Sequence, residues 1–235
     1  MALMVNIRWS RDAVISSKRL LNPPDKSVVL CMDEKSQIQA LDRTQASLPM
    51  KKGRAGTMTH DYKRNGTTTL FAALNVLTGV VIGQCLPRHR NGEFLTFLRL
   101  IDKQVPKSLQ VHLICDNYGT HKHPNVTAWL TKHPRFHLHF TPTSSSWLNL
   151  VERWFRELTD KAIRRGVFGS VPDLVEAIEA YLTANNNNPN PFVWTATAEQ
   201  ILEKVRPGRP RSNRQLMVRH YTRRDNPARR WLRVE

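Results

Sequence analysis

Acidic residues are scarce in this chain of 235 residues. Lysine and arginine number 36 against 19 aspartates and glutamates, so the formal net charge is +17 and the isoelectric point is about 10.5. This excess indicates a polyanionic partner, with nucleic acid first and an anionic membrane surface second. Charge alone also leaves open a ribosome-associated or merely basic protein.

Long apolar runs and paired cysteines are also missing. No run approaches the roughly 18–20 residues that a membrane span needs, and the N-terminus lacks the apolar stretch of a signal peptide. We therefore expect a cytoplasmic protein with no membrane partner. Cys31, Cys85 and Cys115 form no CxxC pair and lie in apolar runs, which indicates reduced core residues. The histidines near 121 and 137 lack the further ligands that a zinc site needs.

Hydrophobic residues make up 40% of the chain, enough for a core, and the length suits one compact domain with appendages or two small domains. Their spacing predicts strands at 28–33, 69–76, 80–86, 111–116 and 136–140, with a hairpin turn at 77–79. It predicts helices at 93–105, 123–133, 147–165, 172–184 and 198–205, with a chain break at 185–191 and a basic loop at 42–66. This order predicts an α/β fold, a mixed sheet flanked by helices, in which strands joined through helices run parallel.

The same pattern predicts three parts of the chain. Residues 1–24 form an N-terminal segment or linker, residues 25–205 one domain, and residues 206–235 a flexible tail with ten arginines and two acidic residues. We expect the tail to become ordered only on binding, if at all.

Two carboxylates mark the edge where a ligand is expected. Asp33 and Asp116 each follow an apolar run and are predicted to stand at the C-terminal ends of buried strands, where open sheets of this kind bind ligands. Two buried like charges repel, and a divalent cation removes that conflict. The alternative for each aspartate is a structural role in capping a turn.

Glu152 is the third candidate ligand. On a helical wheel it falls just off the apolar stripe that contains Trp154 and Phe155, so packing of the stripe would hold it at the rim of the sheet. The alternative is an ordinary solvated glutamate. Glu34 competes for the metal role, but strand alternation sends it to the face opposite Asp33.

Three blocks of sequence together resemble a known family. They are Asp33-Glu34-Lys35-Ser36-Gln37, the run 116–121 (DNYGTH) and the run 141–152 (TPTSSSWLNLVE). They are similar to the signature blocks of bacterial insertion-sequence transposases of the IS-six-thirty family, which is related to the mariner elements. The resemblance covers roughly residues 22–205 and also includes 53–57 (GRAGT) and 191–194 (PFVW).

The resemblance implies a ribonuclease-H-like fold and a DDE catalytic triad of Asp33, Asp116 and Glu152, which would bind two Mg²⁺ or Mn²⁺ ions. In this chemistry two ions about 3.5–4 Å apart clamp the attacking and leaving oxygens of an in-line phosphoryl displacement. Water frees a strand end, and the resulting 3′-hydroxyl attacks target DNA. The implied function is a DNA transposase catalytic domain, its partners are transposon ends and target DNA, and a homodimer is a candidate assembly.

Other interpretations stay open. Family members normally carry an N-terminal helix-turn-helix region, and only 32 residues precede Asp33 here. We therefore expect a truncated copy or one segment of a split reading frame, without specific recognition of transposon ends. The alternatives are a catalytically silent DNA-binding remnant and a structure-selective nuclease with the same fold.

Several further residues are candidates for a role in or near the site. His121 matches a family block and either contacts a metal-bound phosphate, orients the second carboxylate or is structural. Trp147 and Trp154 lie on the apolar stripe and are expected in the core. A group of basic residues flanks the expected site and is predicted to line a DNA channel: Lys35, Lys51, Lys52, Arg54, Lys63 and Arg64.

Overall fold

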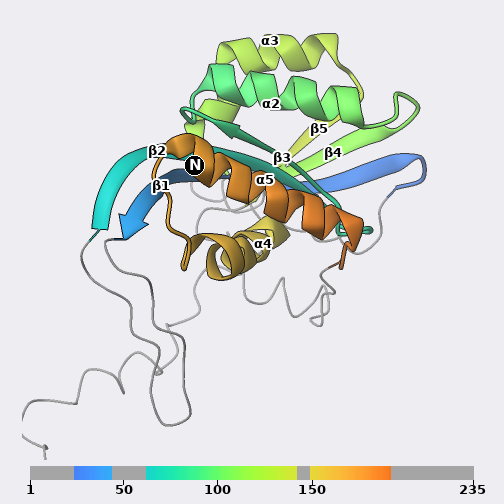
Figure 1. The fold of residues 1–235 in the computed structure, drawn as a ribbon. Helices are drawn as coiled ribbons and strands as arrows, with labels where there is room; N and C mark the ends of the chain where they lie inside the picture. Colours follow the sequence, from blue (N-terminus) through green and yellow to red (C-terminus); the bar gives the residue numbers. More distant parts are fainter. Residues whose placement is uncertain (1–23, 44–61, 142–148, 192–235) are drawn as a thin grey trace, which may run out of the picture.

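A computed structural model describes residues 24–43, 62–141 and 149–191 (Figure 1). Its five strands form one mixed sheet in the order β3-β2-β1-β4-β5. The strands are β1 (Ser27–Arg43), β2 (Tyr62–Asn75), β3 (Val81–Leu86), β4 (Gln110–Cys115) and β5 (Phe136–Phe140). β1, β2 and β3 pair antiparallel, whereas β1–β4 and β4–β5 pair parallel. The prediction of a mixed sheet, in which strands joined through helices run parallel, is confirmed.

The helices cover both faces of the sheet (Figure 1). One face carries α2 (Asn91–Gln104) and α3 (Pro124–Lys132), and the other carries α4 (Leu150–Leu158) and α5 (Val171–Asn187). A 3₁₀ turn, η1 (Gly119–Lys122), precedes α3, and a π-helical turn, η3 (Thr159–Ile163), follows α4. No helix in the described ranges is long and apolar enough to cross a membrane.

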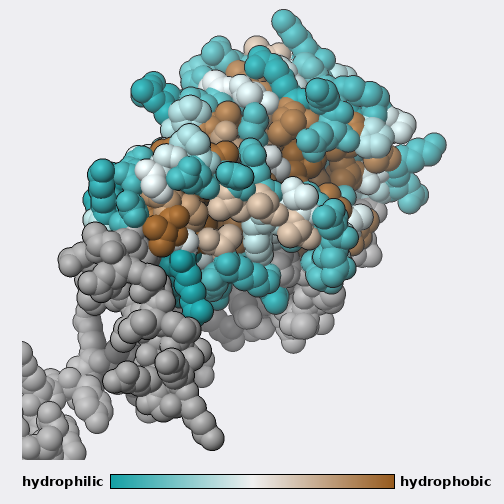
Figure 2. Space-filling model, in the orientation of Figure 1, coloured by the Kyte–Doolittle hydropathy of each residue, from teal (hydrophilic) through white to brown (hydrophobic). Residues whose placement is uncertain are grey.

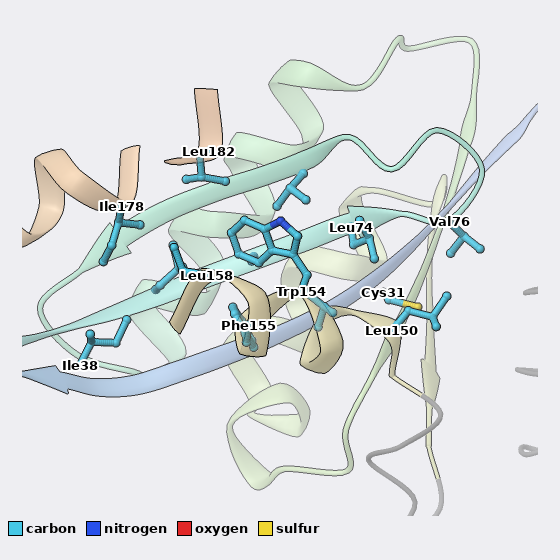
Figure 3. Close-up of a cluster of buried hydrophobic side chains, with 14 of the residues drawn as sticks. Cys31, Ile38, Leu74, Val76, Leu150, Trp154, Phe155, Leu158, Ile178 and Leu182 are labelled. Atoms are coloured by element: carbon cyan, nitrogen blue, oxygen red, sulfur yellow. The ribbon is translucent and has the colours of Figure 1, made fainter. Parts of the chain in front are cut away.

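Alternation along β1 divides the core into two layers. Val29 and Cys31 face α4 and α5, whereas Leu30 and Met32 face α2 and α3. Figure 3 shows Trp154 of α4 at the centre of the first layer, among side chains from the sheet and α5. Most of the face seen in Figure 2 is hydrophilic, with hydrophobic side chains showing between the helices.

The first strand is longer than the predicted 28–33. The parallel pairing with β4 ends at Cys31, but the antiparallel pairing with β2 continues to Arg43. Polar residues after Asp33 hid this extension, although Ile38 and Ala40 in it are buried. Asp33 therefore lies within a long strand rather than at its C-terminal end. For the same reason residues 62–66, predicted as part of a basic loop, belong to β2.

The helix predicted over 172–184 is also longer, because its asparagines act as anchors. The Asn186 side chain accepts a hydrogen bond from Val81 N (2.9 Å) and donates one to Val81 O (2.8 Å). Asn185 accepts from Trp154 Nε1 (3.1 Å). These bonds tie the last turn of α5 to β3 and α4, so the predicted chain break at 185–191 is wrong for its first three residues.

The remaining elements lie close to their predicted positions. The hairpin turn, α2, β4, α3 and β5 agree with the sequence to within about two residues. The predicted helix over 147–165 is observed as α4 followed by the π-helical turn. The segments 1–23, 44–61 and 142–148, the helix expected at 198–205 and the tail 206–235 lie outside the described residues.

Candidate metal centre

Asp33 lies where β1 leaves the parallel part of the sheet. Its Oδ1 accepts a hydrogen bond from Glu34 N (2.7 Å), and its Oδ2 lies 3.4 Å from Asn149 Nδ2. Burial is the largest cause that raises the pKa of Asp33, to about 8, and the hydrogen bond from Glu34 N opposes it. The negative charges of Glu34, Asp116 and Glu152 raise it further. Asp33 therefore belongs to a group of carboxylates whose ionised form needs a counter-charge.

Asp116 follows the last residue of β4, at the predicted edge of the sheet. Its side chain is 43% exposed, and Asp33 is only partly buried, so the expectation of two buried aspartates is wrong for Asp116 and holds only in part for Asp33. Its Oδ1 accepts a hydrogen bond from Tyr118 N (3.3 Å). This contact fixes the carboxylate at the start of the loop that leads to η1.

Glu152 occupies the first turn of α4 and is exposed. The apolar stripe of this helix, which includes Val151, Trp154 and Phe155, is buried against the sheet. The stripe and the exposed glutamate agree with the helical wheel. Glu152 is close enough to Asp33 for its charge to contribute to the raised pKa of Asp33. Its role as a metal ligand stays a prediction, as do those of the two aspartates.

A second group of potential ligands lies behind Asp116. Among the described residues, Glu34, Asp116 and His121 offer ligand atoms that all lie within 4.8 Å of one another. His121 Nε2 lies 2.9 Å from Glu34 Oε1, and His121 Nδ1 lies 3.3 Å from Asp116 Oδ1 and 3.2 Å from Asp116 O. Both ring nitrogens are thus in contact with oxygen atoms already.

This second group is better suited to support Asp116 than to bind a metal ion itself. Burial lowers the pKa of His121, but contacts with Cys115 and Glu34 outweigh it and raise the pKa to about 11. A protonated imidazole donates from both nitrogens and has no lone pair for a metal. Glu34 faces the α2 side of the sheet, opposite Asp33 as alternation predicted, and His121 contacts both Glu34 and Asp116.

Asn149 is a residue that the sequence reasoning missed. It is buried, and its Nδ2 donates to Met32 O (2.9 Å) while approaching Asp33. Its Oδ1 is buried with no hydrogen-bond partner among the described residues. A polar side chain inside the apolar run before α4 was the available signal.

These residues fit a divalent cation. Magnesium and manganese prefer oxygen ligands, and buried polar atoms without partners are costly. Asp33 combines a raised pKa with three neighbouring carboxylate charges, and an unsatisfied carbonyl oxygen belongs to the asparagine beside it. A cation beside Asp33 would supply the counter-charge that its ionised carboxylate needs.

The basic residues expected to flank the site lie only partly within the described chain. Lys35 is on β1, and Lys63 and Arg64 are on the part of β2 that extends beyond β4. The Arg64 guanidinium lies 5.4 Å from the Tyr62 ring centre. Lys51, Lys52, Arg54 and Trp147 lie outside the described residues.

Solved structures share this fold. The Mos1 strand transfer complex is similar with a TM-score of 0.55 at 15% identity, over 85% of this chain and 57% of the Mos1 chain. The catalytic domain of Mos1 mariner transposase gives a TM-score of 0.52 at 12% identity, over 84% of this chain and 85% of that domain. The predicted ribonuclease-H-like fold is thereby confirmed.

Sequence comparison gives the family. An insertion element IS630 uncharacterized 39 kDa protein from Shigella sonnei is 28% identical over 89 residues, which are 38% of this chain and 26% of that protein. The chain therefore covers less than two thirds of the Shigella protein and less than two thirds of the Mos1 chain in the strand transfer complex. The family model described as DDE superfamily endonuclease matches residues 28–175. The chain therefore belongs to the DDE superfamily of endonucleases.

Proposed function

We propose that this chain is the catalytic part of a DNA transposase, which cleaves phosphodiester bonds and transfers strands with a divalent metal ion. The observation that carries the proposal is the position of Asp33 among the carboxylate charges of Asp116 and Glu152. Family membership and the Mos1-like fold support the reaction class. The net charge of +17 supports DNA, both transposon ends and target, as the partner.

In this proposal Asp33, Asp116 and Glu152 hold two Mg²⁺ or Mn²⁺ ions. The Mos1 paired-end complex was solved with Mn, which supports the choice of metal. When bound, such ions polarise the phosphate and stabilise charge on the attacking and leaving oxygens. The oxygen ligands of this chain suit that use because they come from three separate elements, β1, the loop after β4, and α4.

The surrounding residues keep these ligands in place. Asn149 bridges Met32 O and the Asp33 carboxylate, and therefore links the start of α4 to β1. His121 is buried, and its Nδ1 contacts the backbone oxygen and the carboxylate Oδ1 of Asp116. Partners of this kind fix the orientation of metal ligands and are nearly as important as the ligands themselves.

A plasmid assay tests the proposal. Supercoiled DNA is incubated with the full chain in Mg²⁺, in Mn²⁺ and in chelator, and nicked and linear products are quantified. We expect products only with a divalent cation. Asp33→Asn, Asp116→Asn and Glu152→Gln should each abolish them, whereas Asp42→Asn, on the same strand as Asp33, should not.

Three outcomes would contradict the proposal. Cleavage that persists in chelator or in the three variants would place the chemistry elsewhere. DNA binding without cleavage under any cation would support the silent remnant. Cleavage without joining of a 3′-hydroxyl end to target DNA would support a nuclease of the same fold.

A further inference from the structure

A groove of about 560 Å³ opens beside the loop that follows Asp116. It is lined by the loop between β3 and α2, with Arg88, His89 and Arg90, and by the loop after β4, with Tyr118 and His123. Gln37 contributes from the irregular part of β1, where its φ of 53° and a shift in strand register bend the strand. None of these groups has a part in holding metal in the proposed function.

The groove suits a negatively charged ligand. None of the described residues that line it is acidic, and Arg88 and Arg90 are exposed without an ion pair to a described carboxylate. The positive end of the 14-residue helix α2 lies at the same wall, since Arg90 is its N-cap and makes no side-chain cap. Glu93 in the first turn offsets part of this field but does not line the groove.

The groove also offers an aromatic surface. Tyr118 is 47% exposed, and its ring centre lies 6.4 Å from that of His89, which also lines the groove. Arginines beside an exposed aromatic ring are the combination that binds single-stranded nucleic acid, because phosphates contact the cations and bases stack on the ring.

The position and size of the groove narrow the ligand further. Tyr118 N donates to Asp116 Oδ1, so the aromatic surface is two residues from a proposed metal ligand. A cavity of this volume accommodates a nucleotide or two but not a duplex. We infer that the groove binds one unpaired DNA strand next to the phosphate that is cut, with its phosphates on Arg88 and Arg90 and a base on Tyr118. This inference rests on the proposed function, because that function supplies the DNA.

The test compares two DNA probes with the full chain in chelator, so that no cleavage occurs. One probe is a duplex that ends in two unpaired arms, and the other is the same duplex fully paired. Affinity is measured by fluorescence anisotropy over a range of salt concentrations. Tyr118→Ala should weaken binding of the forked probe about tenfold and leave the paired probe within about twofold. Tyr118→Phe, which keeps the ring, should bind the forked probe with the wild-type affinity.

The arginines are tested with a matched charge control. For the forked probe, Arg88→Ala/Arg90→Ala should make the slope of log affinity against log salt concentration shallower, by the equivalent of about one to two phosphate contacts. Lys103→Ala/Lys132→Ala removes two exposed cations from the C-terminal ends of α2 and α3. This control should change binding of both probes equally. Thermal unfolding of each variant shows that the fold is kept.

Equal weakening of both probes by the groove variants would overturn the inference, as would an unchanged affinity for the forked probe. These results are independent of cleavage. If the chain cuts plasmid DNA but the groove variants bind the forked probe as the wild type does, the inference about the groove is refuted and the catalytic function is not. If the groove variants selectively weaken binding of the forked probe but the chain never cuts DNA, the catalytic function is refuted and the inference about the groove is not.

Discussion

At the scale of single residues, the ionised form of Asp33 lowers the stability of the metal-free protein. Its pKa is raised to about 8, with burial as the main cause, against an ordinary value of 3.8. A raised folded-state pKa stabilises the fold fully below the unfolded-state pKa, and this contribution is lost as the pH rises through the folded-state pKa. The metal-free chain should therefore lose stability between about pH 4 and pH 8.

Asp33→Asn should remove this loss. In chelator at pH 9 the variant should be more stable than the wild-type chain by on the order of a few kcal/mol. Mg²⁺ should stabilise the wild-type chain but not the variant, because the carboxylate that binds it is gone. Thermal unfolding from pH 5 to pH 9, with and without Mg²⁺, measures both effects. Identical pH profiles for the variant, the wild type and Asp42→Asn would refute the assignment of the charge conflict to Asp33.

His121 should act through Asp116. His121→Ala should weaken Mn²⁺ binding and metal-dependent cleavage by about 10–100-fold, and raising the Mn²⁺ concentration should recover part of the cleavage. Calorimetric titration with Mn²⁺ and the cleavage rate measure the two effects. His133→Ala is the control, because His133, like His121, contacts a backbone oxygen, but it lies at the far end of α3. Equal effects of both substitutions would show that the role of His121 is only structural.

At the scale of elements, the sequence predicts what periodicity encodes. The hairpin 77–79, the strand 136–140 and the apolar stripe of α4 were predictable because their side-chain patterns match one kind of structure. The extension of β1 was not, since residues 34–37 are polar and only pairing with β2 keeps them in a strand. In the candidate site, such patterns placed Asp116 after the end of β4 and Glu152 beside the apolar stripe of α4, but they wrongly put Asp33 at a strand end. The contact of His121 with Asp116 was one of the interpretations of the sequence, but the contacts of Asn149 with Met32 and of His121 with Glu34 join residues up to 117 positions apart and could not be predicted.

The anchoring of α5 gives a prediction of its own. Asn186→Ala should lower the free energy of unfolding by about 1–3 kcal/mol, because Val81 N and Val81 O lose their side-chain partner. Asn187→Ala, its exposed neighbour in the same helix, should change it by less than about 0.5 kcal/mol. Denaturant unfolding measures both variants. Equal effects would mean that the asparagine run stabilises the helix end without anchoring it to β3.

At the scale of the whole molecule, positive charge is concentrated towards one end of the sequence. Residues 206–235 contain ten arginines and two acidic residues and lie outside the described structure. Removing them should weaken DNA binding and flatten its dependence on salt, because fewer counterions are released. Phosphate contacts position a protein without specifying sequence, so two unrelated duplexes should bind almost equally. A salt titration of the full and shortened chains measures this, and an unchanged slope would exclude the tail from DNA binding.

The central claim is that Asp33, Asp116 and Glu152 hold the metal ions, with Glu34 and His121 in support. Crystals of the full chain soaked in Mn²⁺ test it most directly, through anomalous difference density. We expect two peaks about 3.5–4 Å apart, each within bonding distance of carboxylate oxygens of Asp33, Asp116 or Glu152. A peak bound by Glu34 and a nitrogen of His121, with none beside Asp33, would contradict the account.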